Sequence, residues 1–153
     1  MIKSKLLILG ISSFAGASFA NYLLNNSKYK IYGTYNSRKK LPFKLYLKKN
    51  YNFKKLNLYK LNLNKENNNL IKLIDRIKPN YIIDYASVCM VNESWKDPKY
   101  YYQVNFFSKI NFMNKINQIT SLRKYIYIST PEIFGSSNKI IKENSINYNP
   151  STP

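Results

Sequence analysis

The stretch Leu6-Leu7-Ile8-Leu9-Gly10-Ile11-Ser12-Ser13-Phe14-Ala15-Gly16 decides the fold of this chain. Its first part, residues 6–9, is an unbroken apolar run, which is typical of a central parallel strand covered on both faces. Apolar residues at helical spacing follow over residues 14–24, and the polar residues 25–27 end them. A strand, a turn containing glycine and a helix in this order predict a unit that binds phosphate through backbone N–H groups at the helix start.

The turn supplies the residues that we expect to contact a dinucleotide. Gly10 permits the tight turn, and Gly16 lets the helix approach the strand. Ser13 lies between them and offers a hydroxyl that can donate to phosphate. The predicted contacts are Gly10, Ser12, Ser13, Phe14, Ala15 and Gly16. A turn without a ligand is the alternative interpretation.

The rest of the chain repeats the switch between strand and helix periods. Strands are predicted at residues 6–9, 30–35, 55–58, 81–85 and 124–129, and helices at residues 14–24, 66–77 and 98–119. In the last helix, the side chains expected to face inward are Tyr102, Phe106, Ile110, Met113 and either Ile116 or Ile119. Residues 38–52 are hard to place. This alternation predicts an α/β fold, a Rossmann-type doubly wound parallel sheet in strand order 3-2-1-4-5 with helices on both faces.

Composition limits the choice of partners. A chain of 153 residues with 44% apolar residues can form one domain with a buried core. The net charge of +18 comes from lysines that are scattered along the chain. The abundant Lys, Asn, Ile and Tyr share AT-rich codons, so codon bias accounts for this composition and we expect no nucleic-acid partner.

Missing residue types exclude several classes of site. The chain has no histidine, which excludes Ser-His-Asp hydrolysis and histidine metal sites, and we expect no metal. Cys89 is the single cysteine, so no internal disulfide can form and a cytoplasmic location is expected. Gly10 and two serines interrupt the N-terminal apolar run, which argues against a secretory signal. No window approaches the roughly 18 apolar residues of a membrane span, so no membrane partner is expected.

The end of the second strand bears on the choice of cofactor. An acidic residue there would bind the adenosine ribose and favour NAD, but none occurs in residues 31–49. The residues found there instead include Thr34, Asn36, Ser37, Arg38 and Lys39. They can hold a ribose 2′-phosphate through hydrogen bonds and charge. NADP is therefore the predicted cofactor, and NAD is the alternative, in which Arg38 and Lys39 are solvated loop charges.

Four segments of the second half carry a family resemblance. They are Asn80-Tyr81-Ile82-Ile83-Asp84-Tyr85-Ala86-Ser87, Ser94-Trp95-Lys96-Asp97-Pro98, Asn105, and Tyr125-Ile126-Tyr127-Ile128-Ser129-Thr130-Pro131-Glu132-Ile133-Phe134-Gly135. In this order and at this spacing they resemble the extended short-chain dehydrogenase/reductase family, and more narrowly its sugar-nucleotide 4,6-dehydratases and epimerases. The resemblance implies that residues 1–153 form an NAD(P)-binding Rossmann domain. Gly10 and Gly16 then match the first and third glycines of the family pattern G-x-x-G-x-x-G, and Ser13 replaces the second.

The resemblance also assigns roles outside the turn. Asn62 and Leu63 fall where the family contacts adenine, and Ala86-Ser87 falls where the backbone passes close to the cofactor. The residues that would line the nicotinamide and sugar pocket are Cys89, Met90, Val91 and Ser94, although the family often has histidine at the position of Met90. Asn105 corresponds to an asparagine that ties the long helix to the strand ends.

Thr130 and Glu132 are the catalytic candidates that the resemblance implies. Thr130 takes the place of the Ser or Thr that hydrogen-bonds the sugar hydroxyl being oxidised. In the 4,6-dehydratases a carboxylic pair follows, in which the glutamate abstracts the proton next to the new ketone and the other acid helps to expel water. This chain has Glu132 but Pro131 in place of the other acid, and some epimerase and decarboxylase relatives also have Glu at this position. A surface carboxylate is the alternative interpretation of Glu132.

The implied function is that of an NAD(P)-dependent sugar-nucleotide 4,6-dehydratase, with transient oxidation, water elimination and hydride return. An epimerase or reductase of the same family is one alternative, and a non-catalytic protein that senses dinucleotides is another. The expected partner is a nucleotide-sugar substrate, and a homodimer is expected for the full-length protein.

The last residues lead us to expect an N-terminal fragment. In the family, an N-P-x-[ST]-P segment runs straight into a catalytic Tyr-x-x-x-Lys pair, and here Asn149-Pro150-Ser151-Thr152-Pro153 ends the chain. The catalytic pair and the substrate domain would lie beyond residue 153, and the chain alone is expected to be inactive. We expect Tyr125 and Tyr127 to point into the packed layers of the sheet and not to its carboxyl edge.

Overall fold

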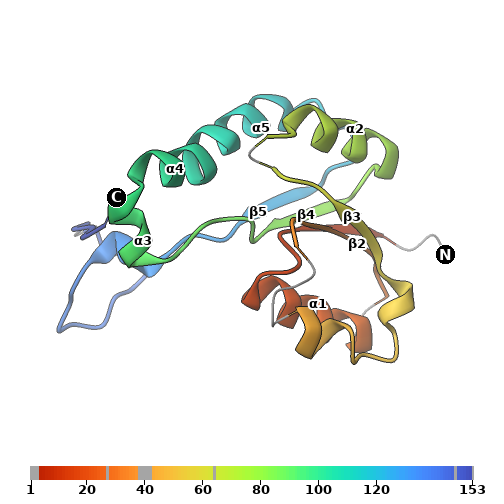
Figure 1. Cartoon of the computed structure of the whole chain (residues 1–153), viewed down its shortest axis with the longest axis horizontal. Coiled ribbons are helices and arrows are strands. Elements are labelled where there is room, and N and C mark those ends of the chain that lie inside the picture. The colour runs from red at the N-terminus through yellow and green to blue at the C-terminus, as the bar shows by residue number, and fades with distance from the viewer. Residues whose placement is uncertain (1–3, 27, 38–42, 64, 147, 153) are drawn as a thin grey trace.

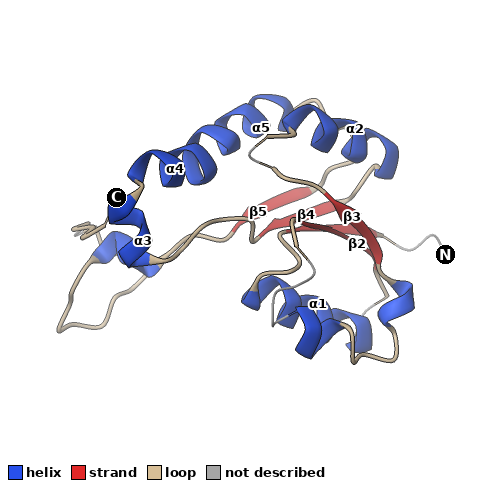
Figure 2. Cartoon of the chain, viewed as in Figure 1, coloured by secondary structure: helices blue, strands red, loops and turns tan. Residues whose placement is uncertain are grey.

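Strand β1 (Lys5–Leu9) lies at the centre of a five-stranded parallel sheet. Figure 2 shows the strands of this sheet in red, with helices on either side. The computed structural model describes residues 4–26, 28–37, 43–63, 65–146 and 148–152. The other strands are β2 (Lys30–Tyr35), β3 (Asn57–Lys60), β4 (Tyr81–Asp84) and β5 (Lys124–Tyr127). Their order is β3-β2-β1-β4-β5, and every neighbouring pair is parallel. The predicted fold class and strand order are therefore confirmed.

The apolar run of β1 serves two hydrophobic cores, because successive side chains of a strand point to opposite faces. Leu6 and Ile8 pack on the face that helix α1 (Phe14–Asn26) covers. Leu7 and Leu9 pack on the opposite face, under helix α2 (Asn67–Ile77) and the helices that follow β4. Figure 1 shows α1 on one side of the sheet and α2, α4 and α5 on the other.

The stretch that the sequence could not place completes the core around α1. Residues Phe43–Leu47 form a π-helical turn, and the side chains of Phe43 and Leu47 are fully buried. Asn50 fixes the next residues to the helix, since its Nδ2 donates to Asn21 Oδ1 over 2.6 Å. One aromatic and one aliphatic side chain, together with an amide hydrogen bond, therefore hold a segment without a clear periodic pattern.

Several predicted boundaries differ from the structure. Strand β3 begins at Asn57 and not at residue 55, because residues Phe53–Lys55 form a 3₁₀ turn that Leu56 N closes on Phe53 O. Strands β4 and β5 end at Asp84 and Tyr127, slightly before the predicted ends. A short helix, α3 (Val91–Lys96), lies between β4 and the long helical segment, where no helix is predicted from the sequence.

The predicted inward face of the long helix is wrong over most of its length. Helix α4 (Pro98–Tyr102), a π-helical segment (Gln103–Phe107) and helix α5 (Ser108–Ile116) follow one another. The predicted residues Tyr102, Phe106, Ile110 and Met113 are 51%, 53%, 40% and 45% exposed. The residues that are buried instead are Tyr101, Ser108 and Phe112, while Ile116 and Ile119 pack against the core as predicted.

Polar contacts explain this reversal. Asn105 and Lys109 lie on the inner side of the helical segment, where the first reaches the backbone of Val88 and the second the carboxylate of Asp84. An apolar pattern alone does not reveal that polar side chains have buried partners. The exposed apolar residues of this helical segment, named above, lie at helical spacing and form a stripe on its outer side. No contact in the part of the chain that the structure describes tests the homodimer, which stays a prediction. Among the described residues, no helix is long and apolar enough to cross a membrane.

Two phenylalanines on the same helical segment test this packing. We expect Phe112→Ala to lower the free energy of unfolding by about 3–5 kcal/mol, because it empties a buried site between α5 and the sheet. The matched control Phe106→Ala removes a half-exposed ring and should change it by only about 0.5 kcal/mol. Urea unfolding of both variants measures this difference, and equal losses would mean that the other helix face is packed.

Candidate functional site

The turn after β1 is held against two neighbouring strands. Gly10 has φ +70°, and a Cβ on it would lie 2.8 Å from the Cα of Ala86, so only glycine fits. Thr34 of β2 binds the turn, because its Oγ1 accepts from Gly10 N over 3.3 Å and its carbonyl accepts from Ile11 N over 2.9 Å. The turn is therefore fixed before any ligand arrives.

Ser13 marks the start of helix α1. Its Oγ accepts a hydrogen bond from Gly16 N over 3.1 Å, which is the contact of a helix cap. A Cβ on Gly16 would lie 2.6 Å from the carbonyl oxygen of Gly10, so this glycine is also required. The N–H groups of Phe14 and Ala15 have no acceptor among the described residues, as expected in the first turn of a helix. These donors suit an anion at the helix start.

A first pocket opens above this turn, at the carboxyl ends of the strands. Of the predicted cofactor contacts, those that line it are Gly10, Ser12, Ser13, Thr34, Asn36, Asn62, Leu63, Ala86 and Ser87. Gly16 lies beneath the turn, whereas Phe14 and Ala15 line the neighbouring pocket. Arg38 falls outside the described residues. Among the residues that the structure describes, no charged side chain lines this first pocket, so hydroxyl, amide and backbone groups supply its polarity.

The segment after β4 forms the wall between this pocket and the next. Asn105 holds it, because its Oδ1 accepts from Val88 N over 3.0 Å and its Nδ2 donates to Val88 O over 2.8 Å. The helix asparagine therefore ties the helical segment to the strand end, as the resemblance implied. Ser94 belongs to α3, and its Oγ donates to Val91 O over 2.6 Å.

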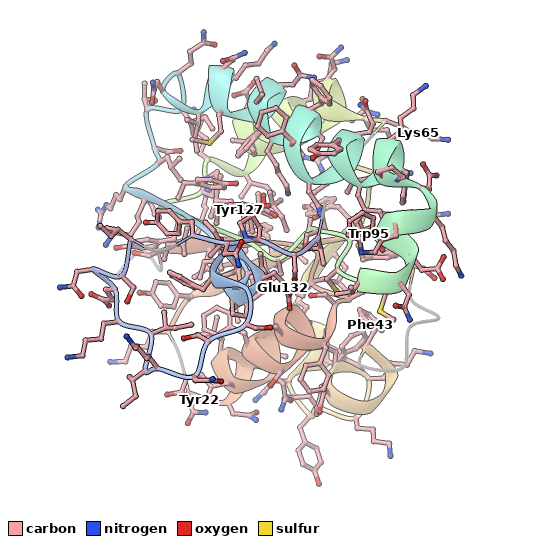
Figure 3. The ribbon with its side chains drawn as sticks, turned by 90° about the vertical axis from the view of Figure 1, so that its left-hand side faces the viewer. Tyr22, Phe43, Lys65, Trp95, Tyr127 and Glu132 are labelled. Carbon is pink, nitrogen blue, oxygen red and sulfur yellow. The ribbon has the colours of Figure 1, made fainter. Side chains whose placement is uncertain are left out.

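A second and larger pocket of about 400 Å³ adjoins the first. The predicted substrate-pocket residues Cys89, Met90, Val91 and Ser94 line it, together with Thr130, Glu132 and Thr152. The two pockets share the walls Ser13, Tyr85, Ser87 and Val88. Figure 3 looks onto this end of the molecule and labels Trp95 of α3, Tyr127 of β5 and Glu132.

Thr130 and Glu132 lie on a short turn that follows β5. The Oγ1 of Thr130 accepts from Glu132 N over 3.3 Å and caps the 3₁₀ turn Pro131–Phe134. Pro131 occupies the first position of this turn, where a residue without an N–H loses no hydrogen bond. Glu132 is exposed beside the second pocket, so its carboxylate can meet a ligand there.

Sequence reasoning missed a buried polar cluster between the strands and α5. Asp84 is 1% exposed, and its Oδ2 accepts from Lys109 Nζ over 2.7 Å and from the Tyr125 hydroxyl over 2.9 Å. The Nζ of Lys109 also lies 5.4 Å from the centre of the Tyr127 ring. An aspartate inside the apolar residues 81–85 was the one available signal, since a buried carboxylate needs a partner.

The two tyrosines of β5 differ in position. Tyr125 points into the packed layer as expected, whereas Tyr127 lines the second pocket, so the expectation for Tyr127 is wrong. Burial, and next the charge of Asp84, raise the pKa of both phenols above its ordinary value. Neither phenol therefore ionises near neutral pH, and neither can act as a base there.

Comparison with known proteins now decides the family. The family model described as GDP-mannose 4,6 dehydratase matches residues 7–153. The chain belongs to this family. The resemblance to the sugar-nucleotide dehydratases and epimerases of the extended short-chain dehydrogenase/reductases is thereby confirmed. Among curated proteins, no match was found.

Solved structures share the fold of this family member. The UDP-Glc/GlcNAc 4-epimerase of Campylobacter jejuni has a TM-score of 0.83 at 23% identity, over 97% of this chain and 44% of that one. The UDP-glucuronic acid 4-epimerase of Bacillus cereus, in complex with UDP-glucuronic acid and NAD, has a TM-score of 0.79 at 22% identity, and the match covers 97% of this chain and 46% of that one. The dTDP-glucose 4,6-dehydratase of Bacillus anthracis, in complex with NAD, has a TM-score of 0.75 at 17% identity, and the match covers 98% of this chain and 45% of that one. This family member thus spans less than half the length of these proteins.

The raised pKa of Tyr125 predicts a loss of stability at alkaline pH. Above about pH 10 the phenol ionises in the unfolded chain, whereas the folded protein keeps its proton, so the free energy of unfolding falls as pH rises. Tyr125→Phe removes this group and should make the fall shallower by about 1.4 kcal/mol per pH unit. Urea unfolding between about pH 8 and about pH 11, limits that enclose the ordinary pKa of a tyrosine, measures how the free energy of unfolding changes with pH. Tyr51→Phe, a change at a fully exposed ring, is the control, and equal slopes in wild type and Tyr125→Phe would contradict the assignment.

Proposed function

We propose that this chain carries the cofactor-binding part of a sugar-nucleotide 4,6-dehydratase that uses NADP. The observation that carries the proposal is the common wall of the two pockets. Ser13, Tyr85, Ser87 and Val88 line both, so a dinucleotide in the first pocket would extend toward Thr130 and Glu132 in the second. Hydride transfer needs this contact between the cofactor and the sugar.

The residues present fit a dinucleotide. Gly10 lets the segment at Ala86 pass close to the turn after β1, and this turn leads into the 13-residue helix α1. Among the described residues, the N–H groups of Phe14 and Ala15 at the start of this helix have no acceptor, so they can donate to a pyrophosphate. Asn62 and Leu63 line the other end of the first pocket, where they would contact adenine. A bound nicotinamide would supply the acceptor and later the donor of the hydride.

The preference for NADP rests on the residues after β2. Tyr35 and Asn36 line the first pocket, and no acidic residue is found there to bind a ribose diol. Arg38 would supply the charge for a 2′-phosphate. The solved relatives from Bacillus cereus and Bacillus anthracis contain NAD, which keeps NAD as the alternative for this chain.

Thr130 and Glu132 would act on the sugar. The Thr130 hydroxyl keeps its proton as a donor while its oxygen accepts from Glu132 N, so it can bind the sugar oxygen that is being oxidised. The Glu132 carboxylate would take the proton beside the new ketone, and the same proton would pass from Glu132 to the neighbouring hydroxyl as its C–O bond breaks, so that the hydroxyl leaves as water. Pro131 cannot supply a proton to this leaving group. An epimerase or reductase, which eliminates no water, is for this reason the second candidate.

Cofactor binding is the first test of this proposal. We expect the chain to bind NADP more tightly than NAD, and Arg38→Ala to weaken NADP binding about tenfold while leaving NAD nearly unchanged, since one charged contact is lost. Titration calorimetry measures both constants, and Lys48→Ala, an exposed lysine nearby in the chain, is the matched control. Equal losses for both cofactors would make Arg38 a general anchor, and no binding of either would refute the proposal.

Turnover is the second test. We expect the 153-residue chain to convert no nucleotide-hexose, because the chain has no histidine and the raised pKa of Tyr127 keeps this pocket phenol from taking the proton of the sugar hydroxyl near neutral pH. An extended protein that contains the Tyr-x-x-x-Lys pair should release a 4-keto-6-deoxy sugar nucleotide. In that protein Glu132→Gln should lower the rate by about 10²–10⁴-fold, the usual contribution of a positioned acid or base, whereas Glu93→Gln on the exposed face of α3 should not. An epimer as the product would select the second candidate.

A further inference from the structure

Asp84 is a buried carboxylate that lines neither of the two pockets, although it lies directly before their common wall. It ends β4, is 1% exposed, and accepts three hydrogen bonds. Its Oδ2 binds Lys109 Nζ and the Tyr125 hydroxyl, and its Oδ1 accepts from Ala86 N over 2.9 Å. Every oxygen of the carboxylate is thus engaged, and Lys109, whose side chain is 12% exposed, balances its charge.

Stability alone does not account for this arrangement. Removing two charges from water is costly, and apolar side chains of similar volume often replace a buried ion pair without loss. The distinctive feature here is the direction of Oδ1, which faces the backbone that leaves the strand. An apolar residue could fill the space of Asp84 but could not accept a hydrogen bond from Ala86 N.

The bond to Ala86 matters because of what lies on either side of it. Ala86 passes Gly10 so closely that a Cβ on Gly10 would lie 2.8 Å from its Cα and its N. Tyr85, Ser87 and Val88 belong to the same segment and line both pockets. Asn105 holds the far end of this segment at Val88, and Asp84 holds the near end.

We propose that Asp84 is a positioning residue, which aligns residues 85–88 as the common wall of the two pockets, and that Lys109 serves as its counter-charge. Lys109 reaches Asp84 from α5, the neighbour of the segment that carries Asn105. One helical layer therefore fixes both ends of the wall. The effect on cofactor binding rests on the proposed function, whereas the alignment of the wall does not.

Two double variants separate positioning from packing. Asp84→Asn with Lys109→Met removes both charges but keeps an amide oxygen that can accept from Ala86 N. Asp84→Leu with Lys109→Met also removes both charges, fills a similar volume and leaves Ala86 N without an acceptor. Glu93→Gln with Lys96→Met removes an ion pair whose side chains are 58% and 71% exposed, and it is the matched control.

The first measurement is amide hydrogen exchange of Ala86 in the protein without ligand. We expect exchange close to that of the wild type in the asparagine variant and in the control. In the leucine variant we expect Ala86 to exchange about tenfold faster, with Ser87 following, because the hydrogen bond is lost. Equal protection in the asparagine and leucine variants would overturn the proposal.

The second measurement is the dissociation constant of NADP. The leucine variant should bind about tenfold more weakly and the asparagine variant about as tightly as the wild type, as the loss of one hydrogen bond implies. If the leucine variant exchanges faster at Ala86 but binds as the wild type does, the wall does not control the cofactor and that part of the proposal fails. If the wild type binds no dinucleotide, the proposed function fails while the exchange data still decide the alignment.

The leucine variant has to fold for this comparison to count. Where its urea midpoint falls far below that of the asparagine variant, Asp84→Thr with Lys109→Met replaces it, because the shorter hydroxyl side chain suits a strand. Its hydroxyl ends one bond short of the Oδ1 position, so Ala86 exchange should again be faster than in the asparagine variant. Exchange as slow as in the wild type would overturn the proposal.

Discussion

Backbone of the segment after β4 passes within van der Waals distance of the turn after β1, and most of the site depends on this approach. A methyl group on Gly10 would lie 2.8 Å from the Ala86 backbone. The two segments of the chain can therefore approach each other only because Gly10 has no side chain. Thr34 fixes the turn from one side, and Asp84 and Asn105 fix the facing segment from the other. The residues where these two segments meet form the common wall of the two pockets, since Ser13, Tyr85, Ser87 and Val88 line both.

The sheet could be predicted because its signals are local and mutually consistent. Residues 6–9 are apolar without interruption, which places them in the middle of a parallel sheet, and the strand order follows from right-handed crossovers. The start of β3 could not be predicted, since the bonds of the Phe53–Lys55 turn compete with the strand and leave no mark on periodicity. Phe43 and Leu47 were missed because a π-helical turn has neither the strand nor the α-helix period.

The helical segment after Pro98 shows where pattern reasoning reaches its limit. Phe106 and Ile110 repeat at α-helical spacing and were expected inward, yet Asn105 and Lys109 lie on the inner side. A polar side chain can be buried when a specific partner receives it, and the partners of these two lie 17 and 25 residues away in the chain. For Asn105 a family resemblance supplied this information. For Lys109 nothing did, and the cluster around Asp84 emerged only from the three-dimensional arrangement.

The walls of the pockets come from segments that span nearly the whole chain, from Gly10 to Thr152. No short piece of the protein therefore contains a site, and a ligand in either pocket can bind only the folded molecule. Such a ligand adds RT ln(1 + [L]/Kd) to the free energy of unfolding, which amounts to about 2.7 kcal/mol at a concentration of 100 Kd. Any metabolite that binds in either pocket would in this way raise the resistance of the protein to heat and to proteases as its concentration rises.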